Sequence, residues 1–410
     1  MGMTKRFIDL FAGCGGLSLG LTQAGWQGVF AVEKSTDAFG TLKHNLVEGT
    51  AVKGFDWPSQ LPCEAMTTAS LLARHGSFLA RLRGSIDLIA GGPPCQGFSF
   101  AGRRNPNDPR NKLTEEYIEI VGLVRPKLLL LENVRGFTSA FTTSTEQQAI
   151  PYSEIVAGRL EDLGYKVFKK MLNASRFGVP QPRPRFIMIA IRSELYTGAR
   201  PFMHLEQAIR EFRIGNGLPA EGDIPVRDAI SDLEIDGAQL IPSTDTNGFQ
   251  QIRYTPRRLT PYQSLMRKSL DPSFTPNSLR LPNHNEETSA RFRRILTRFP
   301  KGKSLRKSDL EALGTKKQAF TPLHPNLLSK TITTLPDDLL HYSEPRILTV
   351  RENARIQSFP DWYDFLGKYT TGGARRKDES PRYSQVGNAV PPLMAEALGK
   401  IIQTLDLVDE

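Results

Sequence analysis

Short apolar runs alternate with helix-like segments through the first 191 residues, and this alternation constrains the fold more than any other feature. The apolar runs are residues 6–13, 28–33, 86–92, 127–134 and 185–191, with turn residues near their ends. Segments between them, such as 16–25 and 114–124, have the pattern of helices. Strands that alternate with helices usually pair in parallel, so we expect a mostly parallel α/β sheet over residues 1–191.

The rest of the chain has a different character. A length of 410 residues suggests two domains, or one domain with a large insertion. From residue 192 onward Pro, Asn, Ser and Arg become frequent and the regular alternation is lost. We therefore expect a smaller second domain over residues 192–340, a hinge over 341–380, and a C-terminal segment, 381–410, that returns to the first domain.

Several classes of protein are disfavoured by what the sequence lacks. No apolar run has membrane-spanning length, and the first residues lead into a strand without a signal-peptide pattern, so we expect a cytoplasmic protein without a membrane partner. The three cysteines, Cys14, Cys63 and Cys95, have neither paired nor metal-type spacing. Neither a disulfide framework nor a metal site is expected, and a functional thiol would act alone.

Basic residues are concentrated in one segment. The formal net charge of the chain is +10, and residues 251–310 alone hold 14 basic and 4 acidic residues, a surplus as large as that of the whole chain. Such a surplus is typical of a surface that binds a polyanion, because neutralised phosphates release counterions. The alternative is a solvated helix whose arginines only cover its surface.

A glycine loop follows the first predicted strand. Gly13, Gly15 and Gly16 let the backbone approach a ligand at a helix N-terminus. A dinucleotide fingerprint needs Gly or Ala at position 18, where Ser18 stands, so a phosphate cradle is not the best fit. Glu33 ends the next strand, where a carboxylate can bind both hydroxyls of a ribose. The pattern favours a nucleoside cofactor without a pyrophosphate, such as S-adenosyl-L-methionine.

A thiol and a carboxylate are expected at the carboxyl edge of the sheet. Pro93 and Pro94 cannot extend a strand, so the chain leaves the sheet there and presents Cys95. A lone cysteine is more often an inert core residue, but a core thiol would stand within the apolar run. A second apolar run leads into Glu132 and Asn133, where the carboxylate is either a structural cap or an acid with a raised pKa.

Two arginines belong to the same hypothesis. Arg183 and Arg185 alternate along a segment that two prolines stiffen, and beside a thiol and a carboxylate they could bind an anion and lower the thiol pKa. The alternative is a pair of surface arginines.

Nine blocks together resemble the cytosine-5 DNA methyltransferase family of bacterial or phage type. In order they are DLFAGCGG, the acidic Glu33, DWP at 56–58, GGPPCQGFS, RNKL at 110–113, ENV, QPRPR, RENARIQSFP and QVGNAVPP. The resemblance extends from Asp9 to Pro392 and leaves only residues 192–328 uncovered. It implies a Rossmann-like, S-adenosylmethionine-dependent methyltransferase sheet with a smaller target-recognition domain.

The resemblance also implies the catalytic roles. Cys95 would be the nucleophile that adds to carbon 6 of the cytosine, which turns carbon 5 into an enamine carbon able to attack a sulfonium methyl. Glu132 would hold and protonate ring nitrogen 3, which offsets the developing charge. Asn133 would shape the pocket, and Arg183 and Arg185 would hold the base carbonyl and the neighbouring loop.

The resemblance also implies which residues of this chain bind the cofactor and which contact DNA. The implied cofactor residues are Phe11, Gly13, Cys14, Gly15, Gly16, Glu33, Asp56, Trp57, Pro94, Leu113, Asn388, Ala389 and Val390. Because a cytosine inside a duplex cannot reach a thiol, the base must swing out of the stack. A loop over residues 96–110 would close on the DNA. The implied contacts are Gln96, Ser99, Arg103 and Arg104.

The expected partner is therefore double-stranded DNA with a specific sequence, bound by a monomer. A cognate restriction endonuclease would act separately, or the enzyme would be solitary. The sequence disfavours three alternative functions. Transfer-RNA cytosine methyltransferases carry a Cys-Phe-Thr tripeptide in the recognition region, and no cysteine follows Cys95 here. A non-catalytic DNA-binding module would not need Cys95, Glu132 and Arg185 together, and Ser18 and the thiol disfavour a nicotinamide oxidoreductase.

Overall fold

The chain divides into two units. A computed structural model describes residues 4–93, 111–139, 150–255, 257–315, 317, 319–371 and 379–408. Unit 1 comprises Met1–Asn173, Pro184–Ala208 and Met394–Glu410, and unit 2 comprises Ala174–Arg183 and Ile209–Leu393. Within the described residues, no helix is both long and apolar enough to cross a membrane.

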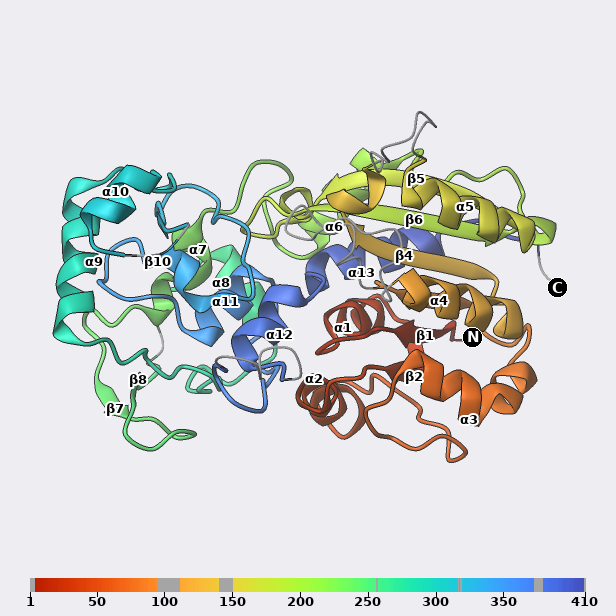
Figure 1. Cartoon of the computed structure of the whole chain (residues 1–410), viewed down its shortest axis with the longest axis horizontal. Helices are drawn as coiled ribbons and strands as arrows, with labels where there is room; N and C mark the ends of the chain where they lie inside the picture. Colours follow the sequence, from red (N-terminus) through yellow and green to blue (C-terminus); the bar gives the residue numbers. More distant parts are fainter. Residues whose placement is uncertain are drawn as a thin grey trace. The chain divides into compact units, whose positions relative to one another are not determined.

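Unit 1 is built on a six-stranded sheet (Figure 1). The strands are β1 (Arg6–Leu10), β2 (Gln27–Val32), β3 (Leu88–Gly91), β4 (Leu128–Val134), β5 (Tyr165–Asn173) and β6 (Pro184–Arg192). Their order in space is β2-β1-β3-β4-β6-β5. Neighbours among β1 to β4 pair in parallel, whereas β6 is antiparallel to both β4 and β5. The predicted fold class, a mostly parallel α/β sheet, is confirmed.

Strand β5 is absent from the runs that the sequence predicts as strands. It lies at the edge of the sheet, and Lys166, Lys169 and Lys170 expose their side chains along it. It therefore lacks the continuous apolar run that distinguishes a strand buried on both faces. Lysines on an edge strand also discourage pairing with a second chain.

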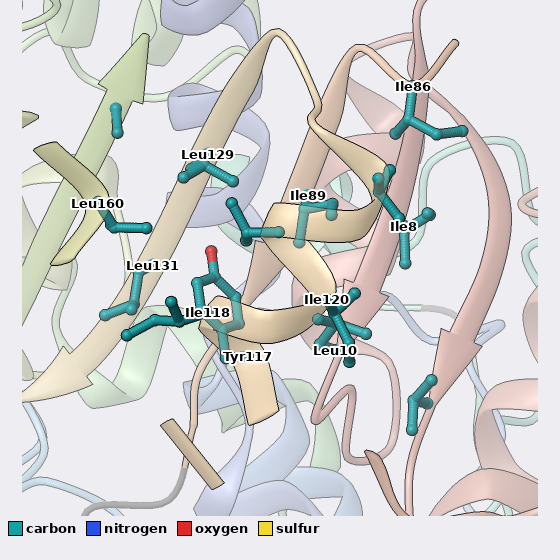
Figure 2. Packing of buried hydrophobic residues seen from close by; sticks show 14 of the residues in the cluster. Ile8, Leu10, Ile86, Ile89, Tyr117, Ile118, Ile120, Leu129, Leu131 and Leu160 are labelled. Atoms are coloured by element: carbon teal, nitrogen blue, oxygen red, sulfur yellow. The ribbon is translucent and has the colours of Figure 1, made fainter. Parts of the chain in front are cut away.

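Helices cover both faces of this sheet. They are α1 (Gly16–Gln23), α2 (Thr36–Leu42), α3 (Thr68–Arg81), α4 (Asn111–Val124), α5 (Tyr152–Asp162) and α13 (Pro392–Gln403). Helices α3, α4 and α5 pack on one face, where Tyr117 and Leu160 join Ile8 and Leu10 in one apolar cluster (Figure 2). Side chains alternate along a strand, so Asp9 points to the opposite face, where α1 lies.

Unit 2 consists of short helices with little sheet (Figure 1). Helix α6 (Leu205–Gly215) enters it from unit 1. The other helices are α7 (Val226–Ile230), α8 (Pro261–Met266), α9 (Glu286–Arg298), α10 (Lys307–Ala312), α11 (Val350–Ile356) and α12 (Arg382–Asn388). The strands β7 (Leu240–Pro242) and β8 (Gln250–Ile252) form an antiparallel hairpin. The strands β9 (Thr321–Pro322) and β10 (Leu339–Leu340) pair in parallel.

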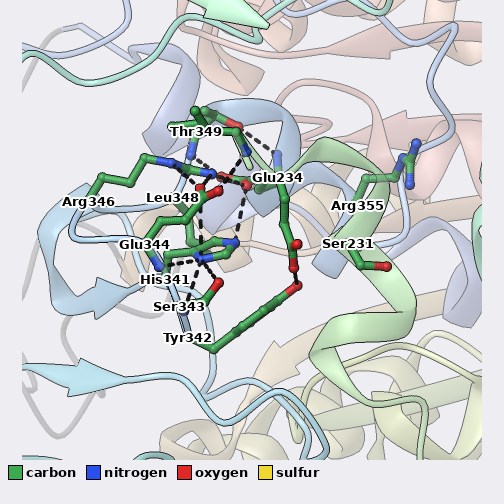
Figure 3. A network of polar contacts seen from close by, with 12 residues as sticks. Ser231, Glu234, His341, Tyr342, Ser343, Glu344, Arg346, Leu348, Thr349 and Arg355 are labelled. Carbon is green, nitrogen blue, oxygen red and sulfur yellow. Dashed lines mark hydrogen bonds and ion pairs between the residues drawn. The ribbon is translucent and has the colours of Figure 1, made fainter. Parts of the chain in front are cut away.

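Several ion pairs are buried in the interior of unit 2. Arg346 pairs with Glu352 at 2.7 Å and also with Glu344, and Figure 3 shows this network around His341. Fully buried Arg355 pairs with Asp361 at 2.5 Å. Arg355 and Glu352 belong to the family block at 351–360, so that block serves the interior of the unit. Removal of one partner from such a pair typically costs about 3–5 kcal/mol.

Candidate active site

The turn after β1 carries the glycine loop. Gly13 and Gly15 have φ of +57° and +88°, in the left-handed region that glycine adopts without strain. The amide of Leu19 donates to the carbonyl of Gly15 at 2.8 Å, so α1 begins directly after the loop. Gly16 is the first residue of that helix, and the thiol of Cys14 is buried beside it.

Glu33 lies next to this loop, immediately after β2. Its Oε2 accepts the amide N–H of Gly13 at 3.0 Å, and its Oε1 accepts that of Ser35 at 2.8 Å. Burial raises the pKa of Glu33, and these two amide hydrogen bonds oppose that effect. Each carboxylate oxygen has a further lone pair with which to accept a hydrogen bond from a ligand hydroxyl.

A second buried carboxyl, Asp9, was missed by the sequence analysis. Ser18 Oγ donates to Asp9 Oδ2 at 2.5 Å, and both side chains are fully buried. Burial is the main cause that raises the pKa of Asp9 to about 7. The signal in the sequence was a charged residue inside an apolar strand. The pair also explains why a serine stands where a dinucleotide-binding loop has glycine.

The remaining cofactor candidates of unit 1 have varied environments. Phe11 and Trp57 are half-buried and pack against the apolar cluster of Figure 2. Trp57 Nε1 donates to the carbonyl of Leu61 at 2.9 Å. Leu113 is half-buried in α4. Asp56 has an exposed side chain whose Oδ1 is 3.6 Å from Lys53 Nζ, and its amide bonds to Gly28 at the start of β2.

Glu132 and Arg185 form an ion pair at the end of β4. Arg185 Nε lies 2.6 Å from Glu132 Oε1, with side-chain exposures of 11% and 12%. The antiparallel register places Arg185 opposite Val134, so Glu132, two residues away on the same face, is its diagonal neighbour. Arg185 Nη1 also donates to the carbonyl of Pro184 at 2.9 Å. The Arg185 guanidinium therefore fixes the orientation of the Glu132 carboxylate, and the carbonyl of Pro184 fixes the guanidinium.

The chain that leaves β3 is held against the same residues. Asn133 Nδ2 donates to the carbonyl of Pro93 at 3.0 Å. A Cβ on Gly92 would come within 3.1 Å of Glu132 Oε2, so glycine permits this close approach. Cys95, Pro94, Gln96, Ser99, Arg103 and Arg104 lie outside the described residues. The described chain thus comes within two residues of Cys95 at Pro93.

Arg183, two residues before Arg185, has different surroundings in unit 2. Its guanidinium donates to the carbonyls of Ile332 at 2.9 Å, Gly387 at 2.6 Å and Ala389 at 3.3 Å. The side chain is 3% exposed. Arg183 therefore joins three segments of the family blocks through their backbone. Nothing in its spacing from Arg185 distinguished the two arginines beforehand.

Two glutamines complete that junction and were missed by the sequence analysis. Gln181 accepts from the amide of Ile332 and donates to the carbonyl of Ile356, each at 3.1 Å. Gln357 Nε2 donates to the carbonyl of Ala389 at 2.5 Å. The cofactor candidates at the end of α12 belong to the same unit. Of these, Asn388 is exposed, Ala389 buried and Val390 half-buried.

The two described cysteines are not activated. Burial raises the pKa of Cys14 to about 12 and also raises that of Cys63, so both thiols stay protonated near neutral pH. In the described part of the chain, no His, Cys, Asp and Glu side chains cluster in a group of three or more that could hold a metal ion.

These features define a class of protein. The sheet carries a glycine loop after β1, a carboxylate after β2, and a Glu–Arg pair at the end of β4. Open α/β sheets bind ligands at the carboxyl ends of their strands, so this is an α/β enzyme suited to a nucleoside-containing ligand.

Comparisons with known proteins narrow the class to a family. The family described as C-5 cytosine-specific DNA methylase matches residues 5–404. The chain is 32% identical to Type II methyltransferase M.DdeI of Desulfomicrobium norvegicum, over 97% of this chain and 88% of that protein. It is also 32% identical to Type II methyltransferase M.XorII of Xanthomonas oryzae, over 96% and 83%. The chain belongs to the C-5 cytosine-specific DNA methylase family and is a DNA cytosine-5 methyltransferase.

Solved structures agree on the fold. A protein assigned as a DNA modification methyltransferase encoded within an Escherichia coli prophage has a TM-score of 0.66 at 23% identity, over 98% of this chain and 99% of that one. The Dnmt2 methyltransferase of S. pombe has a TM-score of 0.54 at 16% identity, over 97% of each chain. The family resemblance and the methyltransferase fold inferred from the sequence blocks are confirmed.

Proposed function

We propose that Cys95 is the nucleophile with which this chain methylates carbon 5 of a cytosine swung out of double-stranded DNA. One observation carries the assignment: the Asn133 side chain binds the carbonyl of Pro93, Gly92 lies close to Glu132, and only Pro94 separates Pro93 from Cys95 in the sequence. The described chain therefore approaches the ion pair of Glu132 with Arg185 two residues before Cys95. A nucleophile, an acid and a cation are the groups that this chemistry requires.

Each residue has a defined part in the proposed reaction. The sulfur of Cys95, once its proton is lost, forms a bond to carbon 6 of the cytosine, and the electron pair of the ring double bond moves toward carbon 5. Glu132 holds a proton at ring nitrogen 3, which neutralises charge on the ring as it develops. Arg185 keeps Glu132 in position. Once carbon 5 carries the methyl group, its proton is released to solvent. The double bond between carbons 5 and 6 then re-forms as the bond between carbon 6 and sulfur breaks, which frees Cys95 as a thiolate.

The methyl group would come from S-adenosylmethionine, which supplies it on a positively charged sulfur. The residues of unit 1 fit this cofactor, because Glu33 offers two carboxylate oxygens beside a loop of left-handed glycines. We assign the ribose hydroxyls to Glu33 and the adenine to Phe11, Trp57 and Asp56. The other proposed contacts are Gly13, Cys14, Gly15, Gly16, Pro94, Leu113, Asn388, Ala389 and Val390.

We assign recognition of the DNA sequence to unit 2. Helix α9 supports this assignment, because Arg294 and Arg298 lie one turn apart on it and are exposed. Neither forms an ion pair with another described residue, so both are available to phosphates. Gln96, Ser99, Arg103 and Arg104 would contact DNA from unit 1. We assign Arg183 a positioning role, since its guanidinium is used by three carbonyls.

The biological setting is also a proposal. The similar proteins M.DdeI and M.XorII are named Type II methyltransferases. This supports a role beside a separate restriction endonuclease, with the enzyme acting as a monomer in the cytoplasm on nucleoid DNA.

Bisulfite sequencing tests the function directly. A plasmid propagated with the gene, in a host without cytosine methylation, should carry 5-methylcytosine at one recurring sequence. Cys95→Ser should abolish this modification and leave DNA binding largely intact, because the thiol acts after docking. Cys63→Ser is the matched control and should retain methylation. An unmodified plasmid, together with methyl transfer to transfer RNA, would favour the RNA alternative instead.

A further inference from the structure

One arginine of the basic segment is held rigidly without an acidic partner. The guanidinium of Arg280 lies 4.1 Å from the ring centroid of Phe249 and 3.7 Å from that of Tyr369. Stacking on aromatic rings restricts a long side chain that would otherwise sample many rotamers. Arg280 is therefore preorganised before it meets any ligand.

The nearest carboxylate is committed to other groups. Asp245 forms an ion pair with Arg382, and its two oxygens accept the hydroxyl of Tyr369 at 2.8 and 3.0 Å. The guanidinium of Arg280 has no hydrogen-bond or ion-pair partner among the described residues, and its Nε is buried. The residue as a whole is half-buried, and its two terminal nitrogens are not among the fully buried atoms that lack a partner.

Other arginines of residues 251–310 differ in this respect. Arg267 pairs with Asp361, Arg291 with Glu287 and Arg306 with Asp309. Arg294 lies on the exposed surface of α9 without such a clamp. Arg280 alone among these five combines a fixed guanidinium with unused terminal donors.

The surroundings of Arg280 have the shape of a DNA-reading element. Arg280 forms a β-bridge with Gln251 of β8, and Phe249 and Asp245 come from the loop that joins β7 to β8. This hairpin extends from the body of unit 2, in green (Figure 1). A two-stranded β-ribbon fits the major groove of B-form DNA, where guanine presents its O6 and N7 acceptors.

We propose that Arg280 determines sequence specificity by donating both terminal nitrogens to O6 and N7 of one guanine in the recognised site. The inference rests on the proposed function of unit 2 in DNA recognition. A planar fork matches these two acceptors, whereas a lysine ammonium does not. The aromatic clamp removes most of the entropy cost of ordering the fork on binding.

The test uses the methylated sequence found by bisulfite sequencing. Purified wild-type enzyme is assayed on duplexes in which each guanine of that sequence is replaced in turn by 7-deazaguanine, which lacks the N7 acceptor. One replacement should lower kcat/KM roughly tenfold or more, the loss expected for a bidentate contact. With Arg280→Lys, kcat/KM on the natural duplex should fall, and sensitivity to that same replacement should disappear.

Controls separate base reading from other roles. Arg294→Lys also exchanges arginine for lysine in unit 2 and should keep the wild-type pattern of sensitivity. Arg280→Gln provides a second variant, and thermal unfolding checks that each variant is folded. The proposal is overturned if no guanine is sensitive in the wild type, or if Arg280→Lys keeps the wild-type pattern or loses activity equally on all duplexes. Absence of DNA methylation in the wild type would instead refute the proposed function.

Discussion

Asp9 shows what a single buried carboxyl can do to this fold. It lies within an apolar strand, and the hydroxyl of Ser18 donates a hydrogen bond to it. Its ionised form loses hydration on burial, and this raises the pKa from 3.8 to about 7. Between these two values the folded protein holds a proton that the unfolded chain has released. The stability associated with the protonated form is therefore lost as the pH rises through about 7.

Replacement of Asp9 by asparagine should remove this dependence. Asparagine can still accept from Ser18 but carries no charge to bury. Relative to the wild type, Asp9→Asn should become more stable as the pH rises from 4 to 8, by up to about 4 kcal/mol in the free energy of unfolding. Urea unfolding at several pH values measures this difference. Asp162→Asn, at an exposed position on α5, is the control for the removal of a surface carboxylate. A flat difference for Asp9→Asn would contradict the burial argument.

Between elements of unit 1, α13 lies very close to the end of α1. Trp26 Nε1 donates to the carbonyl of Gly399 at 3.1 Å. A Cβ on Gly399 would lie 2.8 Å from the Cβ of Ala24 and 3.2 Å from Leu21. Real side-chain carbons do not approach so closely, so the C-terminal helix can dock only because this position has no side chain.

A pair of glycine-to-alanine substitutions tests this contact. Gly399→Ala should destabilise unit 1 by about 1–3 kcal/mol, since overpacking outweighs the gain in helix propensity. Gly158→Ala in α5 is the matched control, because a Cβ there would meet no atom within 4 Å. It should be neutral or stabilise by up to about 1 kcal/mol. Chemical unfolding measures the free energy of unfolding of both variants. Equal changes in the two variants would show that the close approach of Gly399 to Ala24 does not affect stability.

For the whole molecule, unit 1 is discontinuous in sequence. It is assembled from three segments of the chain, and the last of them, Met394–Glu410, carries most of α13. The glycine loop and Glu33 lie in the first segment. Because the three segments form one compact unit, a cofactor bound at the loop would stabilise the folded state of all three. A ligand that binds only the folded state stabilises it by mass action.

S-Adenosylmethionine should therefore protect the protein against unfolding. At a concentration 100 times its Kd, the expected gain is about 2.7 kcal/mol in the free energy of unfolding. Glu33→Ala should lose most of this gain at the same concentration, because the ribose hydroxyls lose their acceptor. Glu132→Gln should retain it, since that residue is assigned to the cytosine. Thermal or urea unfolding with and without the cofactor checks this, and full protection of Glu33→Ala would contradict the assigned pocket.

The architecture and the family could be predicted from the sequence because their signals are local. Apolar runs bounded by turn residues predicted β1 to β4 and β6, and short motifs in a recurring order predicted the methyltransferase family. Strand β5 escaped prediction because an exposed edge strand needs no apolar run. The glycine loop and Glu33 were likewise recognisable, since their spacing within one βαβ unit reflects their contact.

Tertiary structure alone decided the partners of the charged side chains. Arg183 and Arg185 look equivalent in the sequence, yet one donates to carbonyls about 150 to 200 residues away and the other pairs with Glu132. Arg280 was indistinguishable from the other arginines of the basic segment until Phe249 and Tyr369 were seen beside it. The physical reason is that hydrophobic periodicity depends only on residues that are close together in the sequence. The environment of a charge depends on groups that only folding brings within a few ångströms.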